Sequence, residues 1–174
     1  MEIYESILRD HSTIKSWVKH LMDIPAQDSL TRDIFLEQLQ SLLLVHFKVE
    51  ELTFYVPLKA ANNITDVTSS SHSDHHRITK SLLALHGVSE ASRLHEQLEE
   101  FKTLVESHLT QEEAFMFLVG KAHLSAQEAA QLSAAYELMK ESIRKEGIEK
   151  QMLYRVINLL PSHFSQDFKN VFQV

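Results

Sequence analysis

Histidine and glutamate recur in this sequence at a spacing that suits metal binding. The chain has 174 residues and contains 11 histidines. Two of these histidines begin a His-x-x-x-Glu pattern, His46 with Glu50 and His108 with Glu112. Residues four apart on a helix lie one turn apart on the same face, so both side chains of each pair can reach a common ion. Imidazole and carboxylate ligands suit iron and other first-row divalent metals, and a carboxylate can bridge two such ions.

Both pairs belong to an internal repeat in about the first 120 residues. The segment DHSTI at residues 10–14 matches DHHRI at residues 74–78. The segment HFKVEE at residues 46–51 matches HLTQEE at residues 108–113. The repeat adds one histidine to each His/Glu pair, and we interpret the two halves as one helical hairpin used twice.

The separations of the four repeated histidines predict that they lie at one height in a bundle. His11 and His46 are 35 residues apart, and His75 and His108 are 33 residues apart. Two residues at the same height on adjacent antiparallel helices have the turn near their midpoint, because each residue rises about 1.5 Å. For His11/His46, Glu50/His75 and His75/His108, the midpoints fall in or beside turn-forming segments, at residues 28–29, 62–63 and 91–92.

Apolar residues recur every three or four positions through four stretches, which predicts four helices. The apolar stripes cover residues 7–21, 36–54, 75–85 and 94–119. With only 3 glycines and 3 prolines, the chain has too few turn formers for a β-sandwich or barrel. We therefore predict an all-α protein, with an up-down four-helix bundle over residues 1–120. The residues expected to cap or end its helices are Pro57, Ser69–Ser71 with Ser73 or Asp74, Gly87, Ser89 and Gly120.

Residues 121–174 are expected to add C-terminal helices. The segment SAQE at residues 125–128 is a capping box that opens a helix reaching about Glu146, with Gly147 after it. A shorter helix is expected at Ile148–Leu160. The first of these helices is rich in alanine, which permits close helix approach. This extension is therefore expected either to pack on the bundle or to form the contact of a homodimer.

Six polar side chains would meet inside the predicted bundle. An unpaired buried carboxylate costs several kcal/mol, and an unpaired imidazole costs about 1–3 kcal/mol. A shared metal ion removes this cost, and bundle interiors are a known location of dinuclear carboxylate sites. The alternative is a hydrogen-bonded polar cluster without metal. The doubled pattern favours metal, and the expected ligands are His11, His46, Glu50, His75, His108 and Glu112.

This arrangement resembles the hemerythrin-like (HHE cation-binding) domain family. The resemblance rests on the four repeated segments and covers about residues 1–120. It implies a non-haem di-iron centre, in which two Fe ions share an oxo or hydroxo bridge. The four repeated histidines would be ligands, with Glu50 and Glu112 bridging. Oxygen-carrying members use five histidines, and His72, one turn from His75, is the candidate for a possible additional ligand.

Other residues are expected outside this ligand set. His76 and His95 are placed on solvated faces. Glu51 and Glu113 are expected to contact water or groups around the ligands, and Tyr55 is given no role. An apolar wall around the metal pocket is expected from Ile14, Leu43, Val105 and Phe115.

Charge and composition exclude several functions. The chain has 17 basic and 24 acidic residues, a net charge of −7 and no basic run, which argues against nucleic-acid binding. It has no cysteine, so disulfides and thiolate metal sites are excluded. The N-terminus does not resemble a signal peptide, and no apolar run approaches the roughly 18 residues of a membrane-spanning helix. We expect a cytoplasmic protein without a membrane partner.

Three functions are compatible with these patterns. The first is a di-iron protein that binds or senses oxygen, nitric oxide, peroxide or iron. The second is a di-iron enzyme that decomposes peroxide or repairs damaged iron centres. The third is a metal-free helical interaction module. We favour the first, because the chain has the site but no recognisable element for binding a larger substrate.

Overall fold

The structure is a computed structural model that describes residues 1–62 and 65–146. Nearly all of these residues are helical, and none of them forms a strand, so the predicted all-α fold is confirmed. The elements are α1 (Ile3–Asp23), α2 (Ser29–Glu50), the π-helical η1 (Glu51–Tyr55), α3 (Val56–Asn62), α4 (Thr65–Ala84), α5 (Ala91–Gln111), the π-helical η2 (Glu112–Met116), α6 (Phe117–His123) and α7 (Ala126–Glu146). The helix expected at Ile148–Leu160 lies outside the described residues.

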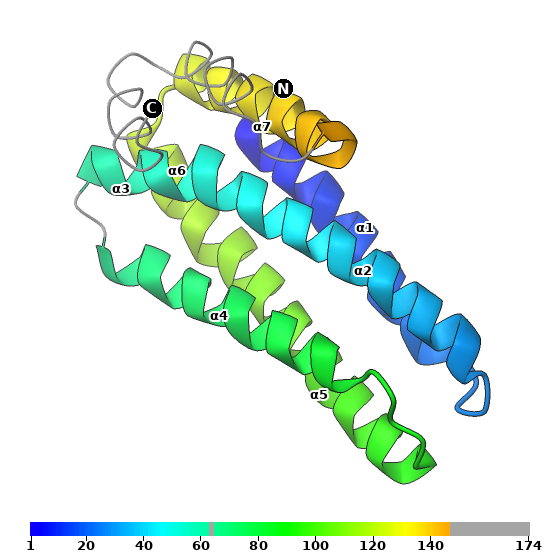
Figure 1. The fold of residues 1–174 in the computed structure, drawn as a ribbon. Coiled ribbons are helices and arrows are strands. Elements are labelled where there is room, and N and C mark those ends of the chain that lie inside the picture. The colour runs from blue at the N-terminus through cyan, green and yellow to red at the C-terminus, as the bar shows by residue number, and fades with distance from the viewer. Residues whose placement is uncertain (63–64, 147–174) are drawn as a thin grey trace.

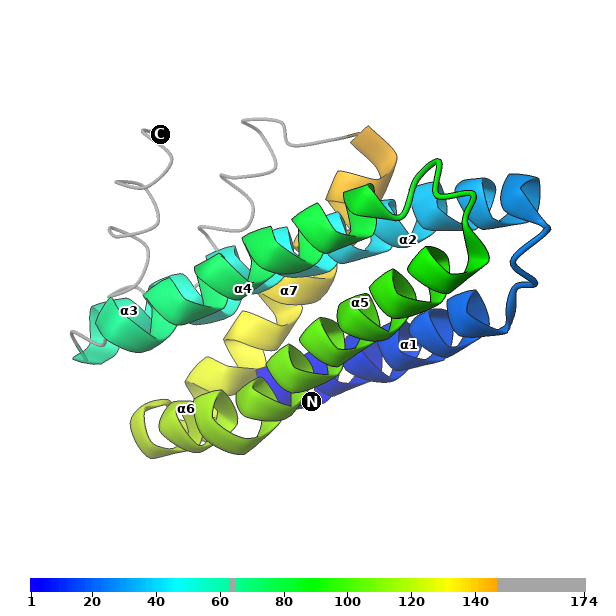
Figure 2. The ribbon, with the colours of Figure 1, turned by 90° about the horizontal axis from the view of Figure 1, so that it is seen from below.

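Helices α1, α2, α4 and α5 form an up-down four-helix bundle. They run side by side in Figures 1 and 2, and each contacts its neighbours in the order α1, α2, α4, α5 and back to α1. Through η1, α3 continues α2, and through η2, α6 continues α5, so the bundle is extended at one end. Helix α7 packs against α1 and α2. Within the described ranges, no helix combines the length and the apolarity that crossing a membrane requires.

The bundle core consists of two apolar clusters with a polar layer between them. The cluster near α7 includes Ile7 of α1 and Val49 of α2. The cluster toward the opposite end includes Ile14 of α1 and Leu43 of α2. Between Ile7 and Ile14, the inward face of α1 carries the fully buried His11. The apolar stripes of the helices are therefore interrupted at the height that the histidine repeat predicts.

Several predicted helix ends are wrong. The helical path of α2 does not end at Pro57, because η1 leads without a break into α3, which contains this proline. Residues 69–74 lie inside α4, which begins at Thr65. Serine has only a weak preference against helix, and packing on neighbouring helices outweighs it. The N-cap of α5 is Glu90 and not Ser89.

Two other predicted signals agree with the structure. Gly87 follows α4 and has a φ of 72°, in the left-handed region that favours glycine. The capping box at the start of α7 is formed, since Ser125 N–H donates to Glu128 Oε2 at 2.8 Å and Glu128 N–H donates to Ser125 Oγ at 3.3 Å. Both signals are local, so the sequence alone is sufficient to place them.

Gly120 does not end a helix, because α6 continues to His123. A Cβ atom at this position would lie 2.8 Å from Tyr4 Cε1 and 3.1 Å from Phe54 Cε2. The glycine instead allows α6 to pack closely against the buried rings of α1 and η1. Its role is therefore in helix packing and not in helix termination.

We expect Gly120→Ala to lower the free energy of unfolding by about 1–3 kcal/mol, because overpacking outweighs a gain of roughly 1 kcal/mol in helix propensity. Chemical denaturation measures this change. Leu118→Ala is the control, since Leu118 lies on the same helix and is 65% exposed. It should change stability by no more than about 0.5 kcal/mol. Unchanged or increased stability of Gly120→Ala would contradict the tight packing.

Candidate metal centre

The six predicted ligands lie together in the polar layer of the bundle. Their exposed fractions range from 0% for His11 and Glu50 to 5% for His75. Each of the four bundle helices contributes to the layer. The residues are His11 from α1, His46 and Glu50 from α2, His75 from α4, His108 from α5, and Glu112 from the start of η2.

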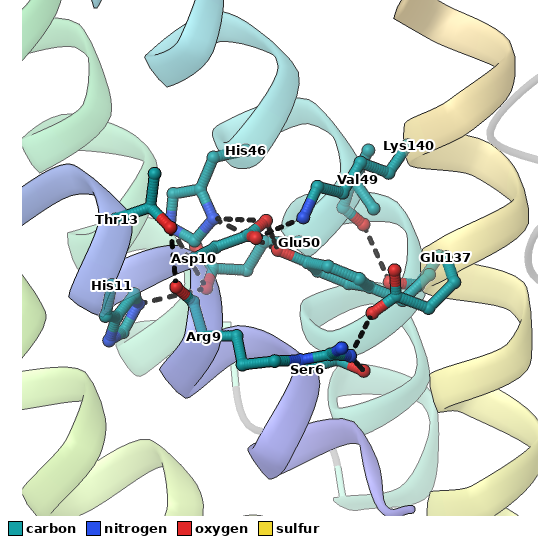
Figure 3. Close-up of polar contacts among 12 residues, drawn as sticks. Ser6, Arg9, Asp10, His11, Thr13, His46, Val49, Glu50, Glu137 and Lys140 are labelled. Atoms are coloured by element: carbon teal, nitrogen blue, oxygen red, sulfur yellow. Dashed lines mark hydrogen bonds and ion pairs between the residues drawn. The ribbon is translucent and has the colours of Figure 1, made fainter.

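The inward-facing atoms of these residues form two groups that share Glu50. Within each group, one ligand atom per residue lies within 4.8 Å of the others. His11 Nε2 lies 3.2 Å from Glu112 Oε2, and His75 Nε2 lies 3.4 Å from Glu50 Oε2. In Figure 3, the side chains of His11 and His46 both reach toward Glu50. The first group is His11, His46, Glu50 and Glu112, and the second is Glu50, His75 and His108.

Five buried atoms of this layer have no hydrogen-bond partner in the described part of the chain. They are His11 Nε2, His46 Nε2, both carboxylate oxygens of Glu50, and Glu112 Oε2. Burying polar atoms without partners is unfavourable. Four of the five atoms face the first group, and Glu50 Oε2 faces His75 of the second. Cations placed in the two groups would compensate every one. The residues present therefore fit a metal centre.

Burial and mutual charge determine the protonation of these residues. Burial lowers the pKa of His46 below its ordinary value and lowers the pKa of His108 to about 3, so both imidazoles are neutral near pH 7. Burial and the charge of Glu112 raise the pKa of Glu50 well above its ordinary value. Burial alone would raise the pKa of Glu112 as well, but the imidazole of His11, 3.2 Å away, lowers it overall. Neutral imidazole is the form that binds metal.

Two glutamates hold ligand histidines from outside. Glu113 Oε1 lies 2.9 Å from His11 Nδ1, and Glu51 Oε1 lies 2.9 Å from His75 Nδ1. Each glutamate comes from one half of the repeat and contacts a histidine of the other half. A carboxylate on Nδ1 leaves Nε2 free to bind a metal and fixes the ring orientation. The expected placement of Glu51 and Glu113 around the ligands agrees with these contacts.

His46 has an outer partner that the sequence does not reveal. Its Nδ1 lies 3.1 Å from the hydroxyl oxygen of Tyr136 on α7. The Tyr136 hydroxyl donates to Asp10 Oδ2 at 2.7 Å, and Lys140 donates to the other oxygen of Asp10. The sequence hints at this contact only through Asp10 and Asp74, which directly precede His11 and His75 in the two repeated segments. Tyr136 and Lys140 lie more than 80 residues from His46 and outside the repeat.

The π-helical segments η1 and η2 change which side chains face inward after the glutamates. A π turn contains about one residue more than an α turn, so a 3.6-residue period does not continue through it. Phe115 is 50% exposed, whereas Met116 and Phe117 are buried, and the predicted place of Phe115 in the pocket wall is therefore wrong. The other three predicted wall residues are buried, namely Ile14, Leu43 and Val105.

Tyr55, at the end of η1, has a role that sequence reasoning missed. It is buried, and its hydroxyl donates to Glu112 Oε1 at 3.0 Å. Burial raises the pKa of Tyr55 well above its ordinary value, so the phenol keeps its proton. The ring stacks beside His75, with centroids 5.9 Å apart, and Phe47 stacks on His75 at 4.0 Å. The matching position in the second half is Phe117, so the repeat supplies one phenol and one phenyl ring.

His72 lies at the surface side of the centre. Its side chain is 54% exposed, and its Nδ1 lies 3.0 Å from Glu51 Oε1. It groups with Glu51 and His75 and not with the two inner groups. His76 and His95 are exposed, as predicted for residues on solvated faces. The structure thus brings the six main candidates together. His72 lies outside them and contacts Glu51 instead.

Sequence comparison places the chain in a known family. Residues 2–117 match the Hemerythrin HHE cation binding domain, so the chain belongs to this family of cation-binding helical bundles. A comparison with curated proteins found no match. The fold is similar to the crystal structure of an HHE cation binding domain-containing protein from Mycobacterium kansasii, with a TM-score of 0.67 and 21% identity over 96% of this chain and 99% of that chain. The predicted family is confirmed.

We expect Met116→Ala to destabilise the protein by about 2–5 kcal/mol, because it removes a buried side chain. Phe115→Ala should change stability by no more than about 0.5 kcal/mol, because half of that side chain is already in solvent. Urea or guanidinium denaturation compares the two variants. The reverse order would show that an ordinary α-helix continues past Glu112 and would contradict η2.

Proposed function

We propose that the protein binds two iron ions at the six buried residues. The observation that carries this proposal is the set of five buried nitrogen and oxygen atoms without hydrogen bonds. Cations compensate such atoms, and a carboxylate shared by two groups, as Glu50 is, suits a pair of neighbouring ions. Mixed imidazole and carboxylate ligation is suitable for iron. Membership of a cation-binding family supports the same assignment.

Each residue has a defined part in this proposal. His11 and His46 would hold one ion, His75 and His108 would hold the other, and Glu50, which belongs to both groups, would contribute to both. Glu112 joins the first group through Oε2, while its Oε1 accepts the hydrogen bond of Tyr55. An iron pair supplies redox and Lewis-acid chemistry when bound. The outer glutamates Glu51 and Glu113 keep the histidine rings oriented.

We further propose that the centre binds or senses a small molecule such as oxygen, nitric oxide or peroxide. Two histidines per ion and the shared carboxylate of Glu50 leave room for a small additional ligand on the proposed ions. The side chains next to the layer are apolar, so little polar surface is available to orient an organic substrate. These features favour a diatomic or triatomic ligand.

Peroxide decomposition is a second candidate, and the position of Tyr55 favours it. Reactions of peroxide require proton transfer, and the Tyr55 hydroxyl is a buried hydrogen-bond donor next to Glu112. The phenol would hold a proton at Oη and would orient Glu112 at the same time. A binding or sensing protein does not require this proton.

The first test is the metal content of the purified protein. We expect about two irons per chain after expression in iron-replete medium, measured by elemental analysis. Glu50→Ala should lose both, because Glu50 belongs to both groups. His76→Ala is the matched control and should lose neither, whereas His75→Ala should lose iron. Absence of iron, manganese and zinc from the wild-type protein would contradict the proposal and favour a metal-free helical module.

The second test separates binding from catalysis. Azide, nitric oxide and peroxide should each change the visible spectrum of the iron-loaded protein. If the protein decomposes peroxide, Tyr55→Phe should slow peroxide consumption by about 100-fold or more while iron content is unchanged. Tyr4→Phe is the control, because Tyr4 is also buried but its hydroxyl has no hydrogen-bond partner among the described residues. Spectral changes with no peroxide consumption would favour a binding or sensing protein. An unchanged spectrum with every ligand would contradict both.

A further inference from the structure

Helix α7 reaches the candidate metal centre through a chain of four polar side chains. Lys140 contacts Asp10, Asp10 accepts from Tyr136, and Tyr136 contacts His46. Tyr136 is completely buried, and Asp10 is 5% exposed. Figure 3 shows Lys140 and Asp10 beside His46, on the side of α1 and α2 that faces α7. This chain joins a helix outside the four-helix bundle to an inward-facing ligand.

The direction of each hydrogen bond follows from the groups involved. An ammonium group only donates, and an ionised carboxylate only accepts, so Lys140 and Tyr136 both donate to Asp10. The Tyr136 hydroxyl has one hydrogen, which it donates to Asp10 in a hydrogen bond. The hydroxyl oxygen of Tyr136 therefore accepts from His46, whose proton must lie on Nδ1. The lone pair of His46 then lies on Nε2, the nitrogen that faces Glu50.

Among the described residues, the second half of the repeat shows no equivalent set of hydrogen bonds. Asp74 corresponds to Asp10, but it contacts Arg77 of its own helix at 3.3 Å. His108 corresponds to His46, and among the residues that the structure describes it has no comparable partner on its outer nitrogen. Both histidines of the first group, His11 and His46, are held from outside. In the second group, the contacts among described residues hold His75 in this way but not His108.

We propose that Tyr136 is a positioning residue for His46 and makes the ion position of His11 and His46 the tighter of the two. This inference rests on the proposed metal binding. Outer partners of metal-binding histidines fix the tautomer and ring orientation, and their loss typically lowers metal affinity by about 10- to 100-fold. Tyr136 acts on one position only, because its hydroxyl contacts His46 and Asp10 and no residue of the second group.

The test is the stepwise removal of iron from the loaded protein by a chelator at increasing concentration. Wild-type protein should release its two irons in two separate steps. Tyr136→Phe should move the later step to an about tenfold lower chelator concentration and leave the earlier step unchanged. His108→Ala should retain the later step, which assigns that step to the first group. The visible spectrum, recorded at each step, should change in Tyr136→Phe only for the tighter iron.

Ser133→Ala is the matched control on α7. Ser133 is buried and its hydroxyl bonds to Ser6 of α1 at 2.9 Å, so the substitution also removes one polar contact between α7 and α1. It should leave both chelation steps unchanged. An equal shift in Ser133→Ala and Tyr136→Phe would show that α7 acts only through packing, and that result would overturn the inference. Unchanged steps in Tyr136→Phe would overturn it as well.

Asp10→Asn provides a second route to the same result. It weakens the acceptor that fixes the Tyr136 hydroxyl, so it should shift the same step as Tyr136→Phe. The double variant, Asp10→Asn with Tyr136→Phe, should shift that step no further than the larger of the two single effects. Both residues act on the ion position through the same contact with His46. Additive shifts would contradict a common path through His46. If wild-type protein holds no iron at all, the proposed metal binding itself fails, which is distinct from every outcome above.

Discussion

The burial of unpaired ligand atoms is the constraint on which the rest of this structure depends. Five such atoms lie in the polar layer, and each costs about 1–3 kcal/mol when it has no partner. Their combined cost is comparable to the whole free energy of unfolding of an ordinary domain, about 5–15 kcal/mol. The two apolar clusters on either side of the layer must offset that cost until a cation is bound. Folding and metal binding are therefore linked in this bundle.

The helical period and the repeat were sufficient to predict the bundle and the place of its polar layer. His11, His46 and Glu50 lie where the midpoint argument puts them, because α-helices rise evenly along the chain. The π segments could not be predicted in this way, since a pattern analysed with a 3.6-residue period does not reveal a wider turn. The same turns explain why Tyr55 faces the centre and why Phe115 does not.

Some of the outer contacts of the candidate ligands could also be predicted from the sequence, and others could not. Glu51 and Glu113 follow ligand glutamates directly in the sequence, so their place near the centre was visible from the motif. Tyr136 and Lys140 contact Asp10 from positions 126 and 130 residues away, on a helix outside the repeat. No spacing rule connects residues that meet only because α7 packs against α1 and α2. Predicting their role requires the tertiary structure.

A repeated hairpin supplies similar inward-facing donors from its two halves, yet their surroundings differ. Tyr55 of the first half corresponds to Phe117 of the second, so a single hydroxyl reaches Glu112. Asp10 is joined to α7, whereas its counterpart Asp74 pairs with Arg77 near the surface. The ring orientation and tautomer of the metal-binding histidines, and the polarity around them, all affect a bound ion even when its direct ligands stay the same. Differences between two ions in such a centre can therefore arise wholly from residues that never touch them.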